Sequence, residues 1–441
     1  MRPSHATRRV FRPIGPRRGV PGTVASPTMY APARSVPRAR RAAVAAPRPA
    51  LPGPRRGAVR TRLAALAALA AVLFATGCAG DAGGSGGDAR WQAGQGGGST
   101  GAAGPATGDQ PAAPNAPDEP SISLTATGDV IMGNAPDRLP PNGGKGFFDD
   151  VKSALKGDLV MGNLEEPLTD DTGAGKCGPQ PKNCYQFRAP PGYAAHLRSA
   201  GFQLLNQANN HGYDYGRQGY ENTQSALEAH GLKHTGAPGE ITVVDVKGVK
   251  VAVVGFSSYP WSNSLVDLNA AKQVIEMAKE AAQIVVVQVH MGAEGSDKTR
   301  VKPGTEMFFG ENRGDPIRFS RTVIDAGADL VIGHGPHVLR GMEFYKGRLI
   351  AYSLGNFAGG GKSLNSSGRL GWGGVLKVSL TAEGKFVGGT FTSTVMNGVG
   401  RPSVDRQNRG LGLVRELNGA DFPDTGAKLD ATGRITAPAG G

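Results

Sequence analysis

The sequence has few cysteines, few charged residues and no long apolar run. Only 3 of its 441 residues are Cys and 19% are charged, whereas 68 are Gly and 32 are Pro. This composition excludes a coiled coil, and the lack of long apolar runs excludes a membrane protein with several spans. With 39% hydrophobic residues a core can form, but much of the chain must be loop or linker. The length allows up to about three domains.

Negative charge is missing from the beginning of the chain. Residues 1–62 contain 15 Arg but no Lys, Asp or Glu, and residues 63–78 contain no charged residue. Because these 15 charges exceed the net +13 of the whole chain, residues 79–441 carry a net charge of −2. The basic character therefore belongs to a leader, which removes the main argument for a nucleic-acid partner. The Arg- and Pro-rich composition of residues 1–62 is typical of disorder.

Residues 63–78 have the parts of a secretory signal. Two arginines precede the apolar run Leu63–Phe74, which is followed by Ala75-Thr76-Gly77-Cys78. The run is short for a bilayer span, and the four residues after it resemble a bacterial lipobox, in which Cys78 is lipidated and becomes the mature N-terminus. The lipobox pattern more often has Leu where Ala75 stands. An uncleaved anchor helix is the alternative, and both interpretations place the rest of the chain outside the cytoplasm.

A tether is predicted between the signal and the folded part. Residues 79–120 contain 12 Gly and 5 Pro and almost no large apolar side chain, so they cannot bury enough surface to fold. Such a tether lets a folded domain stand off the membrane from a lipidated Cys78. Residues 121–400 are predicted to form that domain, and residues 401–441, which are polar and contain Gly and Pro, are predicted to form an irregular tail.

Short apolar runs alternate with helix-compatible stretches in the folded part, which predicts a layered α/β domain. Strands are expected near Ile122–Thr127, Leu159–Met161, Phe202–Asn206, Val243–Val246, Val249–Gly255, Ile284–Val289, Leu330–Ile332, Gly341–Tyr345 and Leu349–Ser353. Helices are expected near Phe148–Leu155, Gly192–Ala200, Gly216–His230, Ala270–Ala282 and Pro316–Ala326. Lys-Gly turns at residues 247–248 and 346–347 predict hairpins, and Gly374–Leu380 with Lys385–Val395 predicts another, so the sheets should be mixed.

The two remaining cysteines, Cys177 and Cys184, are separated by a turn-forming spacer that contains Gly and Pro. In an exported protein this spacing favours a disulfide that closes the loop. A metal pair is the alternative, but it needs two further ligands nearby, and the spacing does not match a zinc knuckle.

Polar side chains follow strand after strand at the carboxyl end, which is where open α/β sheets bind ligands. They are Asp129, Asn163 with Glu165, Asn209-Asn210-His211, His290, and His334 with His337. Each feature alone has a simpler explanation, such as a Gly-Asp turn, a helix cap or a buried core histidine. Together they place four of the 8 histidines beside carboxylates and amides, a donor set that suits Zn, Mn or Fe.

These segments resemble the CapA family of bacterial poly-γ-glutamate capsule proteins, whose domain is a variant of the calcineurin-like metallophosphoesterase fold. The resemblance covers about residues 120–400 and is carried, in family order, by Thr127–Gly133, Gly157-Asp158 with Asn163–Glu165, Ala208–Gly216, Val289–Gly292, Gly333–Val338 and Leu349–Phe357. It implies a four-layer α/β/β/α sandwich of metallophosphoesterase type, with mixed sheets and a metal cleft at the strand ends.

The resemblance also implies roles for individual residues. Asp129 matches the first metal-binding Asp, and Glu165 is the first candidate for a carboxylate that bridges two ions, with Asp158 the second. Asn210 matches a metal ligand and His211 the catalytic imidazole. His290 matches a single strand-end ligand, and His334 and His337 match the last pair of ligands.

Two departures from the metallophosphoesterase pattern bear on the number of ions. Ile131, which cannot coordinate a metal, stands where the pattern has His. The last pair reads His334-Gly-Pro-His337, one residue longer than the His-x-His of the phosphoesterases. We therefore expect one divalent ion (Mn, Zn or Fe) or a weakly held second one, and the two-metal mechanism, which needs ions ~3.5–4 Å apart, is in doubt.

Further polar residues lie beside these motifs. Ser353 and Asn356 either line the cleft or satisfy a turn, while Glu166, Asp214 and Glu343 are candidates for orienting the histidine rings or for purely structural roles.

Three functions are compatible with this fold, because fold alone does not decide function. The first is an exported, lipid-anchored CapA-type protein that takes part in making, exporting or anchoring an anionic capsule polymer, together with capsule synthetase subunits. The second is a metal-dependent phosphoesterase or an amide hydrolase acting on polyglutamate or cell wall. The third is a polymer-binding module without turnover. All three expect an extracytoplasmic protein held to the membrane through Cys78, with no nucleic-acid partner.

Overall fold

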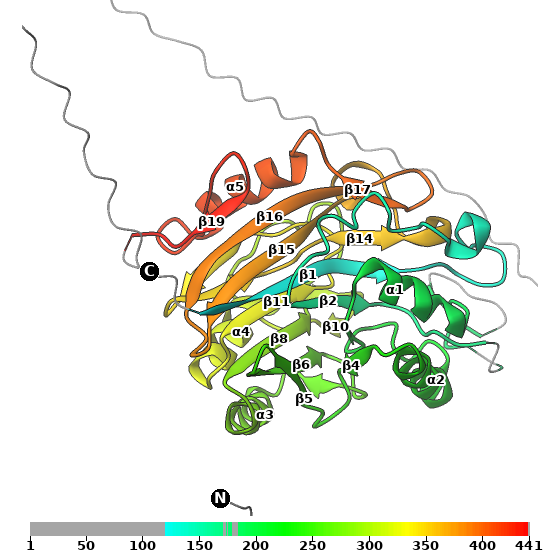
Figure 1. Ribbon diagram of the computed structural model, residues 1–441, viewed down its shortest axis with the longest axis horizontal. Coiled ribbons are helices and arrows are strands. Elements are labelled where there is room, and N and C mark those ends of the chain that lie inside the picture. The colour runs from blue at the N-terminus through cyan, green and yellow to red at the C-terminus, as the bar shows by residue number, and fades with distance from the viewer. Residues whose placement is uncertain (1–119, 171–172, 174, 179–183, 440–441) are drawn as a thin grey trace, which may run out of the picture. The chain divides into compact units, whose positions relative to one another are not determined.

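The computed structural model describes residues 120–170, 173, 175–178 and 184–439 (Figure 1). The leader 1–62, the signal segment 63–78 with Cys78, and all but the last residue of the tether 79–120 lie outside these described residues. Within them, no helix combines the length and the apolar character needed to cross a bilayer.

A ten-stranded mixed sheet carries the first half of the functional motifs. Its main path runs in the spatial order β18 (Lys428–Leu429), β19 (Arg434–Thr436), β16 (Phe386–Met396), β15 (Trp372–Thr381), β1 (Ser121–Ile131), β2 (Leu159–Leu164), β3 (Leu204–Asn206) and β4 (Lys233–Thr235). Two further strands, β14 (Asn356–Gly359) and β17 (Pro402–Val404), pair with β1 and β16. The neighbours β1, β2, β3 and β4 are parallel, so their carboxyl ends lie at one edge.

A seven-stranded mixed sheet carries the second half. Its spatial order is β12 (Met342–Tyr345), β13 (Arg348–Ala351), β11 (Leu330–His334), β8 (Ile284–His290), β6 (Val249–Ser257) and β5 (Thr242–Val246), and β7 (Asn263–Ser264) pairs with β6. The inner strands β13, β11, β8 and β6 are parallel. The predicted Lys-Gly hairpins are present as the antiparallel pairs β5–β6 and β12–β13, and a short hairpin of β9 (Met307–Phe308) and β10 (Glu311–Asn312) lies apart.

Helices cover the outer faces of both sheets, as Figure 1 shows. They are α1 (Ala194–Ala200), α2 (Gly216–Ala229), α3 (Leu268–Ala281) and α4 (Pro316–Asp325), whereas α5 (Arg409–Asp421) packs on the core between the sheets. There are 3₁₀ turns at Pro141–Gly144, Pro191–Tyr193, Gly360–Lys362 and Gly368–Gly371. One apolar core packs α1 and α2 on the ten-stranded sheet, and another packs α3 and α4 on the seven-stranded sheet. A third lies between the two sheets. The described residues therefore form the expected four-layer α/β/β/α sandwich.

Alternation along the strands decides which side chain enters which layer. In β6, Val251 and Val253 belong to the core between the sheets, whereas Ala252 and Val254 pack against the outer helices. Both faces of the strand are apolar, as expected for a strand buried on two sides.

A β-bulge in β1 changes this alternation just before the first candidate ligand. Ala126 pairs with Met161 of β2, but Asp129 pairs with Asn163, so β1 contains one extra residue between the two pairs. Ala126 faces the core between the sheets, whereas Val130 beyond the bulge faces the outer core. The bulge thus turns Asp129 toward the seven-stranded sheet, which is the usual effect of a bulge beside a functional site.

Two expected elements differ from the structure. Residues 148–155, expected as a helix, form consecutive turns, with hydrogen bonds such as Val151 N to Phe148 O that span three residues. Residues 401–441, expected as an irregular tail, contain β17, α5, β18 and β19 up to Thr436. There Leu411, Val414 and Leu417 of α5 enter the core between the sheets, and their helical spacing is hidden among glycines and charged residues in the sequence.

Candidate metal centre

The carboxyl ends of strands from both sheets bring five of the expected ligands together. Asp129 comes from β1 and Glu165 directly follows β2, while His290 and His334 are the last residues of β8 and β11 and pair with each other in register. His337 follows three residues after His334. Ligand atoms of Asp129, Glu165 and His290 all lie within 4.8 Å of one another, and all three residues are buried.

His337 links the two carboxylates of this cluster. Its Nδ1 lies 3.2 Å from Asp129 Oδ2, and its Nε2 lies 3.5 Å from Glu165 Oε1. His334 Nδ1 lies 3.5 Å from Asp129 Oδ1, and His290 Nε2 lies 4.0 Å from Glu165 Oε1. Imidazoles from one sheet and carboxylates from the other therefore converge on one small volume.

Several buried polar atoms of the cluster have no hydrogen-bond partner among the described residues. They are Asp129 Oδ2, both carboxylate oxygens of Glu165, Asn210 Oδ1, His290 Nδ1 and both ring nitrogens of His334. Buried polar atoms are normally hydrogen-bonded, so their concentration here calls for a reason. Carboxylate, amide and imidazole lone pairs that converge without donors fit a divalent cation of the Mn, Zn or Fe type.

Without a metal ion, the electrostatics of the cluster favour the protonated forms of Glu165 and His337. Burial would raise the pKa of Asp129, but contacts with His334 and His337 hold that pKa well below its usual range. Burial raises the pKa of Glu165 well above its usual range, and the nearby charges of Asp129 and Glu294 add to this effect. Burial opposes the charged form of His337, yet the carboxylates of Glu165 and Asp129 raise its pKa well above the usual value. The cluster thus attracts positive charge.

A left-handed backbone accommodates the extra residue of the His334-Gly-Pro-His337 segment. Gly335 has φ 110° and His337 has φ 59°, a conformation that costs a non-glycine residue ~1–2 kcal/mol. A Cβ at Gly335 would lie 3.1 Å from the His290 ring, so glycine is required for the close approach. His337 Nδ1 also lies 2.8 Å from Asn356 Oδ1, which places Asn356 of β14 as a residue that orients this ring.

Asn163 holds Asp129 in place, a role that the sequence did not reveal. Its Nδ2 donates to Asp129 Oδ1 at 2.9 Å, and its Oδ1 accepts from Asn206 Nδ2 and Asn209 Nδ2. Asn209 also donates to Leu164 O at 2.9 Å, so this asparagine ties the loop after β3 to β2. The available signal was the register of two parallel strands that each end in Gly-Asp or Gly-Asn.

Glu294 and Arg313 form a second group that the sequence analysis did not identify. Glu294 Oε2 lies 3.7 Å from His337 Nε2, and its Oε1 accepts from Asn210 Nδ2 at 3.4 Å and from Arg313 Nη1 at 2.8 Å. Arg313 is buried, and its Nη2 lies 2.7 Å from His290 Nε2. Glu294 was within reach of sequence reasoning because it follows His290 by four residues, whereas Arg313 lies in a loop with no motif.

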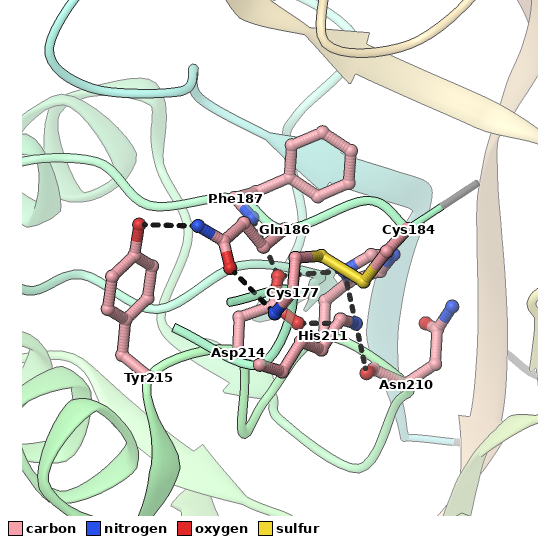
Figure 2. Close-up of a disulfide and its surroundings, with 9 residues drawn as sticks. Cys177, Cys184, Gln186, Phe187, Asn210, His211, Asp214 and Tyr215 are labelled. Atoms are coloured by element: carbon pink, nitrogen blue, oxygen red, sulfur yellow. Dashed lines mark hydrogen bonds and ion pairs between the residues drawn. A yellow bond between two sulfur atoms is a disulfide. The ribbon is translucent and has the colours of Figure 1, made fainter. Parts of the chain in front are cut away.

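His211 lies beside the cluster, next to the disulfide loop (Figure 2). Its Nδ1 is 2.8 Å from Asp214 Oδ2 and 3.3 Å from Lys176 Nζ, and its ring packs 4.6 Å from that of Phe187. Burial lowers the pKa of His211, while Asp214 opposes that shift. Asp214 therefore orients this ring by contacting Nδ1, and Nε2 is the nitrogen that Asp214 does not engage.

The disulfide between Cys177 and Cys184 closes the loop that supplies Lys176. Gln186 Oε1 accepts from Cys177 N at 3.1 Å, and Gln186 Nε2 approaches the Tyr215 hydroxyl at 3.4 Å. Lys176 Nζ contacts Asp214 Oδ1 at 2.5 Å, which neutralises that buried carboxylate. The disulfide thus fixes the segment next to Lys176, whose ammonium group contacts both His211 and Asp214.

The structure places the other candidates away from the cluster. Asp158 precedes β2 and binds Ser123 and Lys247, at the amino end of the strands. Glu166 accepts from Met132 N, and Ser353 Oγ accepts from Gly355 N within a turn. Glu343 binds Arg321, Tyr352 and Thr425. These four residues therefore have structural roles. Ile131, which stands where the metallophosphoesterase pattern has His, is fully buried.

Comparison with known proteins gives one consistent family. The family described as "Bacterial capsule synthesis protein PGA_cap" matches residues 123–360. The Capsule biosynthesis protein CapA of Bacillus anthracis is 33% identical over 261 residues, which is 54% of this chain and 59% of that protein. The PGA biosynthesis protein CapA of Bacillus subtilis (strain 168) is 30% identical over 255 residues, which is 54% of this chain and 63% of that protein.

Among solved structures, a 5′-nucleotidase precursor from Thermus thermophilus superposes with a TM-score of 0.35 and 15% identity, covering 69% of this chain and 58% of that chain. The chain spans about three-fifths of the length of the two Bacillus relatives.

Proposed function

Because this chain belongs to the family of bacterial capsule synthesis proteins, we propose that it takes part in making, exporting or anchoring an anionic capsule polymer of poly-γ-glutamate type. The family match supports the role in capsule synthesis, and the buried cluster supports the involvement of a metal ion. The observation that carries the proposal is the convergence of Asp129, Glu165 and His290, whose ligand atoms lie within 4.8 Å of one another, with His334 and His337 in contact with these carboxylates. Several buried polar atoms of the cluster have no hydrogen-bond partner among the described residues.

A divalent cation fits the donor set. Asp129, Glu165, His334 and His337 would hold it. Asn210 contacts the edge of this group, where its Nδ2 donates to Glu294, and its Oδ1 has no hydrogen-bond partner in the described part of the chain. When bound, such an ion supplies Lewis-acid polarisation of a carbonyl or phosphoryl oxygen. Asn163 and Asn356 fix the orientation of Asp129 and His337 and so keep the donors aimed at one point.

His211 is proposed as the residue that holds or transfers a proton at the substrate. Asp214 binds its Nδ1, which leaves Nε2 for the reacting group. This pairing supports a second candidate function, a metal-dependent phosphoesterase or amide hydrolase. Turnover of a phosphodiester or a γ-glutamyl peptide by the full chain, lost on His211→Ala, would support hydrolysis. Binding without turnover would support a polymer-binding module instead.

The proposal includes export and attachment to the membrane through Cys78. The lipobox-like sequence before Cys78 supports it, and the Cys177–Cys184 disulfide fits an oxidising compartment. Capsule synthetase subunits are the proposed protein partners. We expect Cys78→Ser to move the protein out of the membrane fraction, and membrane retention of that variant would argue against lipidation.

The direct test replaces the gene in its own host. Asp129→Ala and His337→Ala are expected to abolish surface polymer while the protein remains at its normal amount in the envelope. Asp158→Ala is the matched control, because it removes a carboxylate next to β2 but away from the cluster, and it should leave the polymer unchanged. Normal polymer in the Asp129 and His337 variants would show that the cluster has no part in the process.

A further inference from the structure

Arg313 stands at the edge of the candidate metal centre and is fully buried. It lies between the short strand β10 and the helix α4. Its Nη2 is 2.7 Å from His290 Nε2, and its Nη1 donates to Glu294 Oε1 at 2.8 Å and to the Tyr259 hydroxyl at 3.3 Å. The contact of Nη2 with His290 and the contacts of Nη1 with Glu294 and Tyr259 therefore hold the guanidinium in one orientation.

The contact with Arg313 determines which ring nitrogen of His290 is the acceptor and which carries the proton. A guanidinium has donors only, so His290 Nε2 must be the acceptor. In a neutral imidazole the other nitrogen then carries the proton, which makes Nδ1 a donor. Neither nitrogen of His290 has a lone pair left for a metal ion, although Nε2 lies 4.0 Å from Glu165 Oε1.

The surroundings hold the positive charge of Arg313 in place. Besides Glu294, the carboxylate of Glu311 lies 3.6 Å from Nη1, and the rings of Tyr259 and Phe308 each lie 5.9 Å from the guanidinium carbon. A divalent ion coordinated by His290 Nε2 would meet this guanidinium at close range in a buried site, where like charges repel strongly. Arg313 would have to leave its contacts with His290, Glu294 and Tyr259 to make room.

We propose that Arg313 takes the place of a second metal ion, so that the centre binds one divalent cation through Asp129, Glu165, His334 and His337. His290 is then the acceptor that positions Arg313 and is not a ligand. The inference rests on the proposed function only in assuming that a cation binds at the cluster.

The test is a Mn²⁺ titration of the metal-depleted full chain by calorimetry, with electron paramagnetic resonance of the loaded protein. The wild type should bind one equivalent and give the spectrum of isolated Mn²⁺. Arg313→Gln should bind a second equivalent and give the spectrum of an exchange-coupled pair, because His290 Nε2 is released. Arg340→Gln is the matched control, since Arg340 is equally buried but pairs with Glu306, and it should stay at one equivalent.

A second variant keeps the inference testable if Arg313→Gln does not fold. His290→Gln retains an acceptor for Arg313 and should weaken Mn²⁺ binding by less than about 100-fold, the upper limit for losing a residue that only orients a ligand. A loss above about 100-fold would make His290 a ligand and overturn the inference.

The remaining outcomes separate this inference from the proposed function. Two equivalents or a coupled pair in the wild type would overturn the inference and leave the proposed function standing. A folded Arg313→Gln that still binds one equivalent would also overturn it. A wild type that binds no Mn²⁺ would overturn both.

Discussion

The two sheets contribute opposite chemistry to the same centre. The ten-stranded sheet supplies oxygen ligands, Asp129 and Glu165, whereas the seven-stranded sheet supplies the imidazoles His290, His334 and His337. The two carboxylates alone would repel each other, and the imidazoles alone would hold no charge. Among the described residues, nitrogen and oxygen donors of the kinds that suit a transition-metal ion therefore come together where the carboxyl ends of both sheets meet.

The sheets also differ in how they fix their ligands. On the ten-stranded sheet a bulge turns Asp129 inward and Asn163 binds it. On the seven-stranded sheet the left-handed His337 and the Arg313–His290 contact fix the imidazoles. The oxygen half thus depends on strand register and amide hydrogen bonds, and the nitrogen half depends on backbone conformation and a buried charge.

Removing one ligand from each sheet tests whether both halves are needed and should have the largest effect. Asp129→Asn keeps the shape of the side chain but removes its charge, and His334→Gln removes an imidazole. Each should weaken Mn²⁺ binding by more than about 100-fold, at or beyond the upper end of the loss expected for residues that only orient ligands. Calorimetric titration of the metal-depleted full chain measures both.

Equal losses would show that the two sheets contribute jointly. If either variant bound Mn²⁺ within about tenfold of the wild type, its sheet would not contribute a ligand and the comparison would fail. Circular dichroism of each variant provides the control for folding.

The pH dependence of Mn²⁺ binding is the second largest expected effect. Without metal, burial raises the pKa of Glu165, and the carboxylates raise the pKa of His337 against the effect of burial. Both groups then hold protons that an ion must displace, so affinity should rise with pH, by about tenfold per pH unit for each proton released.

The metal-free protein should show the opposite trend. A raised pKa in the folded state stabilises the fold below the unfolded pKa, and this stabilisation is lost as pH rises through the folded value. Urea unfolding of the metal-depleted chain between about pH 6 and pH 8 measures the trend. A Mn²⁺ affinity that does not change over this range would show that neither proton is displaced. His337→Gln should give the shallower slope.

The strands, the edge hairpins and the strand-end histidines could be predicted from the sequence, because they follow from local patterns. Short apolar runs predicted the strands of both sheets, and the Lys-Gly turns predicted their edge hairpins. The imidazoles were identified because each follows a buried apolar strand. Helix α5 was missed because its apolar positions are diluted by three glycines, and the expected helix at 148–155 forms turns instead.

The parts that depend on register or on distant loops could not be predicted. The bulge before Asp129 appears only when β1 is paired with β2, and Asn163 gains its role from that pairing. Arg313 reaches His290 from a loop 23 residues further along the chain. The family resemblance made Asp158 the second candidate for the bridging carboxylate after Glu165, but β2 lies between the two residues and carries them to opposite ends.

A substitution of Asp158 should have the smallest effect, and it tests whether the two ends of the sandwich are independent of each other. Asp158 accepts from Ser123 N at 2.8 Å and pairs with Lys247 of the seven-stranded sheet at 2.8 Å. Ser123 lies six residues before Asp129 along β1, which is about 20 Å in a strand. Both ends of the sandwich thus join the two sheets through an Asp, Asp158 through its ion pair with Lys247 and Asp129 through its contacts with His334 and His337.

Asp158→Asn should destabilise the fold without affecting the centre. Burial opposes ionisation, but Lys247 and Ser123 lower the pKa of Asp158, so its contribution is present above its usual pKa and disappears as pH falls through the lowered value. Because the pair is partly exposed, we expect ~1 kcal/mol or less by urea unfolding at neutral pH, vanishing in acid, with Mn²⁺ affinity unchanged. Glu276→Gln, an exposed carboxylate on α3, should show no effect. A change in Mn²⁺ affinity in Asp158→Asn would mean that the two ends are coupled through the core, and the independence of the centre from this ion pair would be disproved.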